Sequence, residues 1–512
     1  MGARMGVQFK SAVDLLGLMN ARELSSVDIL RQFIERIENF DGHINAVVSR
    51  NFERALELAA AADRKRDRSS VAELGPLHGL PLTVKESFDV CGLPTTWGMA
   101  SQAGNVARRD ADAVTRLINA GAIVFGKTNV PEGLADSQTT NPLYGRTSNP
   151  WDDRLTCGGS SGGSAAALAA GFTCLELGSD LAGSLRTPAH FCGVFSHKPS
   201  YGVVSQIGHS LSGDDAQSDL TVIGPMARSA SDLRLMLESL AAPADFEAVG
   251  WELKLPAARG NRLRDFRVAV LPSHSSCEVD EEIEAAIMRL AQTLQRHGVR
   301  VDQNVEWPVD LDLCLQDYMM MMRAVGTRHS QPDVLKRLSD EAPTLQSGDR
   351  SYRAAVRHAA GLTHHQWLSL NSRRSRFRAA WQRFFRSYDV VLCPVHASLA
   401  FPHNTAIARE LRTLEINGRQ QDYNQSLFWM AIAGHSYLPC TVRPLALVKG
   451  LPTGIQIIGP YLEDMTTLRF AELLDELYPG LDYPLRSGVS KAGELRACPL
   501  DRPGTEMLVH QH

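Results

Sequence analysis

A glycine- and serine-rich stretch decides how this sequence is interpreted: GGSSGGSAAALAAG (158–171), followed after six residues by GSDLAGSLRTPA (178–189). A flexible linker would continue in polar residues, but the first run enters an apolar helix, SAAALAAG (164–171). In the second run, Ser184 follows Ala182 and Gly183, a backbone that can turn several N–H groups inward where a helix begins. Such N–H groups suit a developing oxyanion. The stretch therefore indicates a polar site built on helix starts.

A lysine far upstream offers a base for such a site. Lys85 closes the apolar segment PLTVK (81–85), in a chain that has only nine lysines among its 53 basic side chains. A lysine drawn into an apolar site has a lowered pKa, so its neutral amine can accept a proton. A serine beside that amine can act as a nucleophile. From the pattern alone, serine–lysine chemistry and ordinary glycine-rich turns both stay open.

Two other formal motifs stand in the wrong context. GAIVFGKT (121–128) matches the phosphate-loop pattern, but its four intervening residues are themselves an apolar strand, which leaves no loop to wrap a phosphate. GGSSGG matches G-x-S-x-G at Ser160 and at Ser161. The preceding SNPWDDRLTC (148–157) is polar, whereas a nucleophile elbow follows an apolar strand. We therefore expect neither nucleotide binding nor an α/β-hydrolase elbow.

The surrounding sequence predicts an α/β fold. Short apolar segments at 81–85, 122–126 and 174–178 are typical of buried strands. A helix expected over 110–121 separates the first two, and this alternation indicates an α/β sheet. The N-terminal third has the periodicity of amphipathic helices. The expected organisation is an N-terminal helical segment packed on the core, an α/β domain with a less distinctive middle, and a C-terminal tail, at 1–70, 71–480 (middle about 243–387) and 481–512.

Composition excludes several classes of protein. The chain has 512 residues with 53 basic and 57 acidic side chains, so its net charge of −4 offers no basic field for nucleic acid or an anionic membrane. Hydrophobic residues at 44% and charged residues at 21% are typical of a globular fold rather than a disordered chain. No stretch approaches the ~20 apolar residues of a membrane span, and the start MGARMGVQFK lacks a signal-peptide core. We expect a cytoplasmic protein.

Cysteine and histidine spacing predicts no metal site. The nine cysteines are scattered without a Cys-x-x-Cys pair, and no histidine pair has the spacing of a ligand motif. Reduced, buried thiols are therefore expected, with no disulfide framework and no bound metal.

The segment from Gly158 to Ala189 closely resembles the signature of the amidase signature family. That signature is Gly-Gly-Ser-Ser-Gly-Gly-Ser followed by Gly-Thr-Asp-x-Gly-Gly-Ser-x-Arg-x-Pro-Ala. The resemblance covers most of residues 10–480 and is weakest in the middle. Further matching segments are GKTNVPE (126–132), SNPWD (148–152), HKPSYG (197–202), GPMARSASDL (224–233) and GLPTGIQIIGPYLED (450–464).

The resemblance implies a fold and a set of catalytic residues. The fold would be a large mixed β-sheet core flanked by α-helices on both faces. A Ser–Ser–Lys triad would consist of Ser184 as nucleophile, Ser160 as the bridging serine reached through a cis peptide bond, and Lys85 as general base and acid. No metal or cofactor is implied. The oxyanion would rest on the backbone N–H groups of Leu181, Ala182, Gly183 and Ser184.

Three departures from the family pattern affect the site. Ser179 stands where a threonine is usual, and Ala182 replaces the first glycine of the Gly-Gly-Ser turn. Alanine narrows the accessible φ/ψ range, but the backbone N–H groups of residues 181–184 remain available, so we expect the oxyanion site to persist. Near the C-terminus, GHSYLPCTVRP (434–444) replaces the usual Gly-Leu-Pro-Ala pattern, so one wall of the site is in question.

The implied activity is amide hydrolysis through an acyl-enzyme, with bulky or aryl substrates expected and carbamates and esters as alternatives. Arg186 could bind a substrate carboxylate, and a structural ion pair is the alternative role. Met321, Phe428 and Trp429 could line an apolar pocket, although methionines and aromatic residues at helical spacing also form ordinary core. A homodimer is left open.

Two rival functions come from other classes. The chain could be the amidase-like subunit of a glutamine-dependent transamidating complex, which predicts co-purifying subunits and channelled ammonia. It could also be a catalytically silent binding protein of the same fold, although the presence of Lys85, Ser160 and Ser184 together argues against that role.

Overall fold

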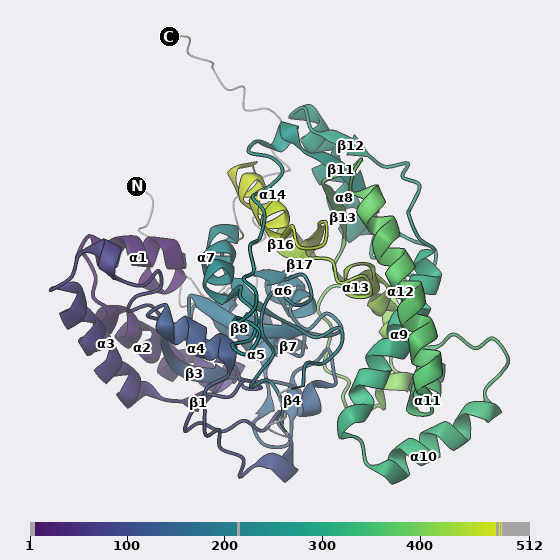
Figure 1. The fold of residues 1–512 in the computed structure, drawn as a ribbon, viewed down its shortest axis with the longest axis horizontal. Helices are drawn as coiled ribbons and strands as arrows, with labels where there is room; N and C mark the ends of the chain where they lie inside the picture. Colours follow the sequence, from purple (N-terminus) through teal and green to yellow (C-terminus); the bar gives the residue numbers. More distant parts are fainter. Residues whose placement is uncertain (1–5, 212–215, 478–480, 482, 484–512) are drawn as a thin grey trace.

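An eleven-stranded sheet forms the centre of the molecule in the computed structural model, which describes residues 6–211, 216–477, 481 and 483 (Figure 1). In spatial order its strands are β1 (Val47–Arg50), β3 (Ile123–Thr128), β2 (Pro81–Lys85), β8 (Leu175–Asp180), β10 (Val222–Ala227), β9 (Phe195–Lys198), β16 (Cys440–Val448), β17 (Leu451–Ile458), β13 (Val390–Pro394), β11 (Arg267–Val270) and β12 (Arg300–Asp302).

The sheet is mixed, as the resemblance implies. Strand β2 runs parallel to β3 and β8, and β11 runs parallel to β12 and β13, whereas the pairings of β8, β9 and β10 and of β9, β16 and β17 are antiparallel. All five residues of β2 are buried, because a strand inside a parallel region is covered on both faces. The expected α/β class with a large mixed sheet is confirmed.

Fourteen helices surround this sheet in the described residues, on both of its faces (Figure 1). They are α1 (Ala12–Asn20), α2 (Ser26–Ile44), α3 (Phe52–Arg66), α4 (Asp112–Asn119), α5 (Gly162–Ala170), α6 (Arg186–Cys192), α7 (Ala230–Leu240), α8 (Glu281–Arg296), α9 (Leu311–Gly326), α10 (Pro332–Glu341), α11 (Tyr352–Ala360), α12 (His364–Phe384), α13 (Leu427–Gly434) and α14 (Asp464–Leu477). The remaining short strands are β4 (Thr140–Asn141), β5 (Gly145–Arg146), β6 (Ser148–Asn149), β7 (Asp152–Thr156), β14 (Thr413–Ile416) and β15 (Arg419–Asp422).

The N-terminal segment is helical apart from one strand that the sequence analysis missed. Helix α2 begins with a capping box between Ser25 and Asp28 and buries a stripe on every fourth residue. Strand β1, only four residues long, pairs antiparallel with β3 at the edge of the main sheet. The segment thus contributes to the sheet as well as packing on it. The boundaries of the three expected units stay predictions, and most of the tail lies outside the described residues.

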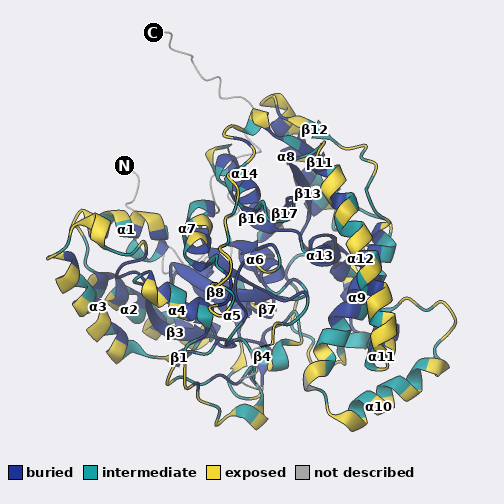
Figure 2. Ribbon diagram, viewed as in Figure 1, coloured by how far each residue is buried: buried dark blue, intermediate teal, exposed yellow. Residues whose placement is uncertain are grey.

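The middle of the chain builds a helical layer beside the sheet. Helices α9, α10, α11 and α12 lie together with α13 on the side of the molecule away from α1, α2 and α3 (Figure 1). Helix α9 packs on both α11 and α13. Burial is deepest at the sheet and along α9 and α13, whereas α10 has no buried residue (Figure 2).

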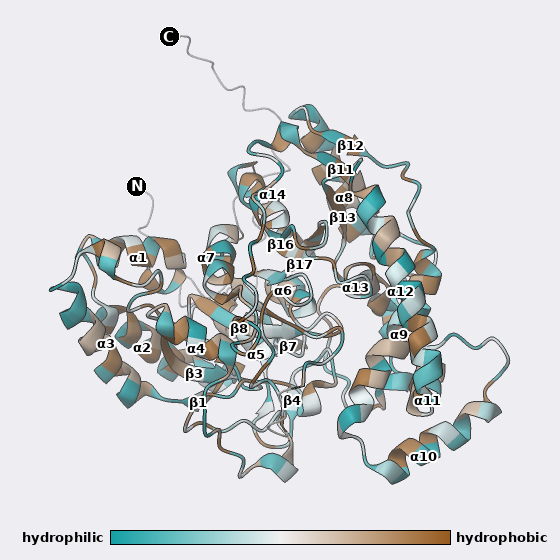
Figure 3. Cartoon of the chain, in the orientation of Figure 1, coloured by the Kyte–Doolittle hydropathy of each residue, from teal (hydrophilic) through white to brown (hydrophobic). Residues whose placement is uncertain are grey.

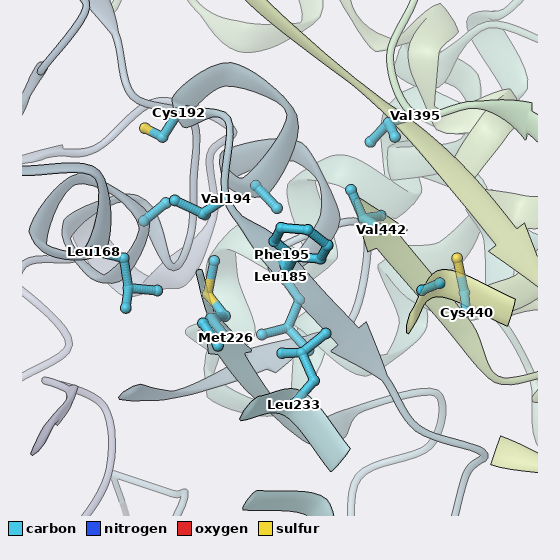
Figure 4. Close-up of a cluster of buried hydrophobic side chains, with 14 of the residues drawn as sticks. Leu168, Leu185, Cys192, Val194, Phe195, Met226, Leu233, Val395, Cys440 and Val442 are labelled. Atoms are coloured by element: carbon cyan, nitrogen blue, oxygen red, sulfur yellow. The ribbon is translucent and has the colours of Figure 1, made fainter. Parts of the chain in front are cut away.

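A core of buried apolar side chains supports the centre of the sheet. Leu185, Phe195, Met226 and Val442, which come from four different elements or loops, meet in one apolar cluster (Figure 4). Hydropathy follows the same arrangement, with apolar residues at the strands and polar residues on the outer helix faces (Figure 3). The loop that carries Ser184 therefore begins and ends on tightly packed structure. Among the described residues, no helix has the length and apolar character needed to cross a membrane.

Candidate active site

Lys85 and Ser160 meet inside the protein. Lys85 is the last residue of β2, and its Nζ lies 2.7 Å from the Oγ of Ser160 and 2.9 Å from the Oγ of Ser179. Ser160 stands just before α5, and the peptide bond between Gly159 and Ser160 is cis, as the resemblance implies. Ser179 lies near the end of β8, the parallel neighbour of β2. Two parallel strands and a helix start thus bring the three side chains together.

Burial tunes the lysine toward its neutral form. The Lys85 side chain is fully buried, and Ser160 is only 2% exposed. Burial lowers the pKa of Lys85 to about 7, although the nearby carboxyl groups of Asp180 and Glu176 act in the opposite direction. At neutral pH a large fraction of this amine is therefore unprotonated and can accept a proton from a hydroxyl group.

Ser184 lies beside this pair on the loop between β8 and α6. Its backbone carbonyl accepts a hydrogen bond of 3.1 Å from the N–H of Ser161, which joins this loop to the residue after Ser160. Ser184 is half-buried and lines a cavity together with Ser160 and Ser179. The structure therefore brings the three residues of the expected triad to one site, with Ser184 the member that is most accessible.

Of the four N–H groups expected to face an oxyanion, the one of Gly183 is bonded within the turn itself. The N–H of Gly183 donates to Asp180 Oδ1 at 2.8 Å, and Gly183 does not line the cavity. The expectation that Gly183 would contribute to an oxyanion site is therefore not met by this arrangement. Leu181, Ala182 and Ser184 do line the cavity. The left-handed φ of the turn falls on Gly183, at 97°, and Ala182 has no positive φ, so the replacement of the usual glycine at 182 causes no backbone strain.

Tyr318 holds the same turn from the opposite side. Its hydroxyl donates to the backbone carbonyl of Leu181 at 2.6 Å, and its ring is fully buried. In a trans peptide the C=O and the following N–H point in opposite directions, so this bond fixes the direction of the Ala182 N–H. The ring of Tyr318 lies against Gly434, where an added Cβ would come within 2.7 Å of it. The unusual segment 434–444 thus begins with a glycine that makes room for Tyr318.

Arg186 has other partners than a substrate. Its guanidinium forms a fully buried ion pair with Asp180 at 3.0 Å and also donates to the Met430 carbonyl and to Gln456 Oε1. Burial acts to raise the pKa of Asp180, but Arg186, together with Lys198 and the N–H of Gly183, lowers that pKa to about 2. The structure therefore shows the structural ion pair and gives no support to Arg186 as a ligand of a substrate carboxylate.

The cavity above Ser184 encloses about 380 Å³. Its wall combines apolar side chains with a few polar ones from the helical layer. The lining includes Trp97, Met99, Leu134, Asp136, His209, Leu211, Met322, Arg323, Val325, Tyr352 and Arg409. The space is large enough for a substrate with a ring system.

Three residues expected in this wall belong to the core instead. Met321 is fully buried on α9, and it is the next residue, Met322, that lines the cavity, because adjacent residues on a helix point about 100° apart. Phe428 and Trp429 are buried in α13 and do not line the cavity. The prediction of an apolar wall is thus met by other side chains.

Sequence analysis missed the aromatic side of the cavity. His209 packs in a tilted arrangement against Phe88 and Trp97, with ring centroids 4.7 and 5.5 Å from its own, and its Nε2 lies 3.0 Å from Ser87 Oγ. Burial, together with the charge of Lys85, lowers the pKa of His209 to about 3, so its ring is neutral. Trp97 stands 12 residues after Lys85, but its position offers no periodic signal that would have identified it.

The described residues contain no cluster of three or more His, Cys, Asp or Glu side chains that could hold a metal ion. The eight described cysteines are free, and all but Cys91 are buried. The ninth, Cys498, lies outside the described residues.

Comparison with known proteins identifies the family. The amidase family model matches residues 28–468. The chain belongs to the amidase family. This confirms the resemblance to amidase signature enzymes and makes amide hydrolysis the supported reaction class.

Individual amidase relatives extend over nearly the whole chain. Indoleacetamide hydrolase from Bradyrhizobium diazoefficiens is 34% identical, over 89% of this chain and 84% of that protein. A glutamyl-tRNA(Gln) amidotransferase subunit from Moorella thermoacetica is 30% identical, over 92% of this chain and 97% of that protein. The crystal structure of an amidase superposes with a TM-score of 0.74 at 29% identity, covering 91% of this chain and all of that one.

Proposed function

We propose that this amidase hydrolyses carboxylic amides through an acyl-enzyme formed on Ser184. Neutral Lys85 accepts a proton from Ser160, which accepts one from Ser184 as Ser184 Oγ bonds to the amide carbon. The tetrahedral oxyanion is stabilised by backbone N–H groups of Leu181, Ala182 and Ser184, since the N–H of Gly183 is bonded to Asp180. The C–N bond then breaks, and the relay returns the proton to the departing amine. Water hydrolyses the resulting ester by the same relay and regenerates the serine.

The observation that carries this proposal is the 2.7 Å hydrogen bond between Lys85 Nζ and Ser160 Oγ, buried beneath a cavity that Ser184 lines. A buried amine of lowered pKa beside a hydroxyl is the arrangement that general-base catalysis needs.

The cavity favours an acyl group that carries an aromatic ring. Trp97 and Tyr352 form part of its wall, with Met99, Leu134 and Met322 as flexible or branched apolar contacts. A relative that is 34% identical is an indoleacetamide hydrolase, whose named substrate pairs an aromatic ring with a primary amide. We therefore propose arylacetamides and similar amides as the substrate class.

Two alternatives rest on specific observations. Carbamates and esters present the same carbonyl to the same nucleophile, so acylation of Ser184 by them needs no further group. Membership of a transamidating complex is the second alternative, because a glutamyl-tRNA(Gln) amidotransferase subunit is a relative over 92% of this chain. That role predicts weak hydrolysis by the isolated chain and strong activity on glutamine with partner subunits.

The test is hydrolysis of a panel by the purified protein, by Ser184→Ala and by the matched variant Ser161→Ala. The panel contains phenylacetamide, hexanamide, glutamine, an anilide, a p-nitrophenyl ester and an aryl carbamate. We expect turnover of phenylacetamide above hexanamide, loss of all turnover in Ser184→Ala, and residual turnover in Ser161→Ala. Activity that persists in Ser184→Ala would contradict the nucleophile assignment. Strong activity on glutamine that appears only with partner subunits would favour the transamidating role.

A further inference from the structure

Two arginines converge on one ring in the wall of the catalytic cavity. Arg323, on α9, and Arg409, at the start of a short 3-10 helix (Arg409–Leu411), both line the cavity that holds Ser184. Their guanidinium carbons lie 5.8 and 5.2 Å from the ring centroid of Tyr352, the first residue of α11. Chain segments separated by more than 80 residues thus bring two cations to the same place.

Neither guanidinium forms an ion pair or a hydrogen bond with a carboxylate in the part of the chain that the structure describes. Nearby carboxylates act on them through their charge alone, Glu410 on Arg323 and Asp136 and Asp422 on Arg409. Arg323 donates only to the Tyr352 hydroxyl, at 3.3 Å, and its buried Nε makes no hydrogen bond there. Arg409 donates to Asn424 Oδ1 at 2.8 Å and to the Ala135 carbonyl at 2.5 Å, which are both neutral acceptors. Each guanidinium therefore keeps N–H groups that no described residue accepts, since arginine has five such donors.

Two neighbouring arginines outside the cavity wall, Arg357 and Arg412, form ion pairs with carboxylates. Arg357, on the same helix as Tyr352, pairs with Glu341 at 3.0 Å and with Glu410 at 2.7 Å. Arg412, three residues after Arg409, pairs with Asp136 at 2.5 Å. This region therefore supplies carboxylate partners to Arg357 and Arg412, which lie outside the cavity wall, and forms no ion pair with Arg323 or Arg409.

Among the described residues, the cavity wall contains one carboxylate, and both of its oxygens already have partners. Asp136 is the only acidic side chain among the described residues that line the cavity. One of its oxygens binds Arg412, and the other accepts a hydrogen bond of 2.8 Å from the Tyr423 hydroxyl. Guanidinium groups removed from bulk water gain most from a planar anion that accepts two hydrogen bonds, which is the geometry of a carboxylate.

We infer that Arg323 and Arg409 form a subsite for a carboxylate carried by the substrate. This inference rests on the proposed amide hydrolysis and narrows its substrate class to amides that bear a carboxylate away from the scissile bond. Apolar parts of the cavity would hold the connecting chain or ring, and Tyr352 would keep the two guanidinium groups in place.

The experiment compares substrates that differ in this charge. The two pairs are adipic acid monoamide against hexanamide, and 4-carboxyphenylacetamide against phenylacetamide, so that a flexible and a rigid connection are both tested. The proteins are the wild type, Arg323→Gln, Arg409→Gln and the matched control Arg353→Gln, which removes an exposed charge beside Tyr352 from outside the cavity. Circular dichroism establishes that each variant is folded.

The wild type should prefer the anionic member of at least one pair by roughly tenfold or more in kcat/KM, since a hydrogen bond to a charged group is worth about 1.5–3 kcal/mol. The preference should weaken at high ionic strength. Arg323→Gln and Arg409→Gln should each lose most of this preference, measured as the ratio of kcat/KM for the anionic and the neutral amide of one pair, and Arg353→Gln should keep it.

A wild type that hydrolyses the neutral amides equally well or better would overturn the carboxylate subsite and leave the proposed function intact. Absence of turnover for every amide would instead contradict the proposed function. If either variant misfolds, Ser184→Ala provides a separate test, because it should bind adipic acid monoamide more tightly than hexanamide in calorimetry. Equal binding of the two amides would overturn the inference.

Discussion

The chemistry of the site depends on one amine in apolar surroundings. Lys85 donates hydrogen bonds to two serine hydroxyls rather than to a carboxylate. Burial therefore disfavours its charged form and lowers its pKa. A neutral amine at physiological pH is the form that can start the proton relay.

This arrangement predicts a defined pH dependence. Protonated Lys85 cannot accept a proton, so activity is lost as the pH falls through its pKa and is regained as the pH rises. The profile of kcat/KM should show an ascending limb with a midpoint near 7, because burial lowers the pKa of Lys85 to about 7. Measurement from pH 5 to 9 with a neutral amide checks this, and a flat profile across that interval would contradict the role of Lys85.

Two adjacent residues of the turn should respond differently to substitution. An added Cβ at Gly183 would lie 2.5 Å from Met430 Sδ in a left-handed backbone. Relief of this strain, roughly 1–3 kcal/mol, should shift the turn, so Gly183→Ala should reduce kcat about fivefold or more. Ala182→Gly restores the usual family residue at a position without positive φ and should change kcat only a few-fold. Steady-state kinetics of both variants tests this contrast. An equal loss of kcat in Gly183→Ala and Ala182→Gly would contradict it.

At the scale of elements, the turn after β8 is held from two sides. Asp180 accepts hydrogen bonds from the N–H groups of Gly183 and Leu185, and α9 reaches the other side through Tyr318. Helix α9 also carries Met322 and Arg323 in the cavity wall. One helix from the middle region therefore lines the cavity and fixes the backbone at the proposed oxyanion site.

Removal of the Tyr318 hydroxyl should affect the transition state more than substrate binding. Tyr318→Phe keeps the ring against Gly434 but frees the peptide between Leu181 and Ala182, so we expect kcat to fall about tenfold or more with KM nearly unchanged. The matched control is Tyr388→Phe, which loses a bond of the same 2.6 Å length to Asp302 outside the cavity. A loss of kcat that is equal in both variants, or a change confined to KM, would count against this positioning role.

At the scale of the whole molecule, a buried ion pair joins separate parts of the sheet. Asp180 ends β8, while Arg186 begins α6 and contacts α13 and β17 through Met430 and Gln456. These contacts connect residues up to 270 positions apart in the sequence.

Arg186→Met should therefore destabilise the protein rather than merely weaken substrate binding. Leaving Asp180 buried without its partner should cost roughly 3–5 kcal/mol of the free energy of unfolding. Denaturant unfolding measures this loss. The control Arg154→Met breaks an exposed pair with Asp152 and should leave the unfolding midpoint unchanged. Native stability of Arg186→Met combined with a raised KM would favour the substrate-binding role instead.

Local sequence patterns predicted the parts of the site that depend on short segments. The apolar run PLTVK corresponds to β2 at both ends, and the helix after GGSSGG is α5, so Lys85 and Ser160 were placed on the right elements. The strand expected at the phosphate-loop match is β3, and the buried Lys127 in it donates to Thr95 Oγ1 at 3.1 Å.

Contacts between distant segments could not be predicted in this way. Tyr318 lies 137 residues from Leu181, and no periodicity in the middle region indicates that α9 meets the turn after β8. The choice between Met321 and Met322 depends on the rotation of α9 about its axis, which a run of four methionines leaves undetermined. The two possible roles of Arg186 could not be separated from the sequence, because local spacing does not show that its guanidinium turns back to Asp180 and reaches Gln456 on β17.

The most direct test of the account is to trap the acyl-enzyme and locate it. The wild type, Ser184→Ala and Ser160→Ala would each be mixed with a p-nitrophenyl ester, quenched in acid and examined by intact-mass and peptide mass spectrometry. The account predicts one acyl group on the wild type, carried by Ser184, none on Ser184→Ala, and slow or absent acylation of Ser160→Ala. Acylation of Ser160, or an adduct that persists on Ser184→Ala, would contradict it.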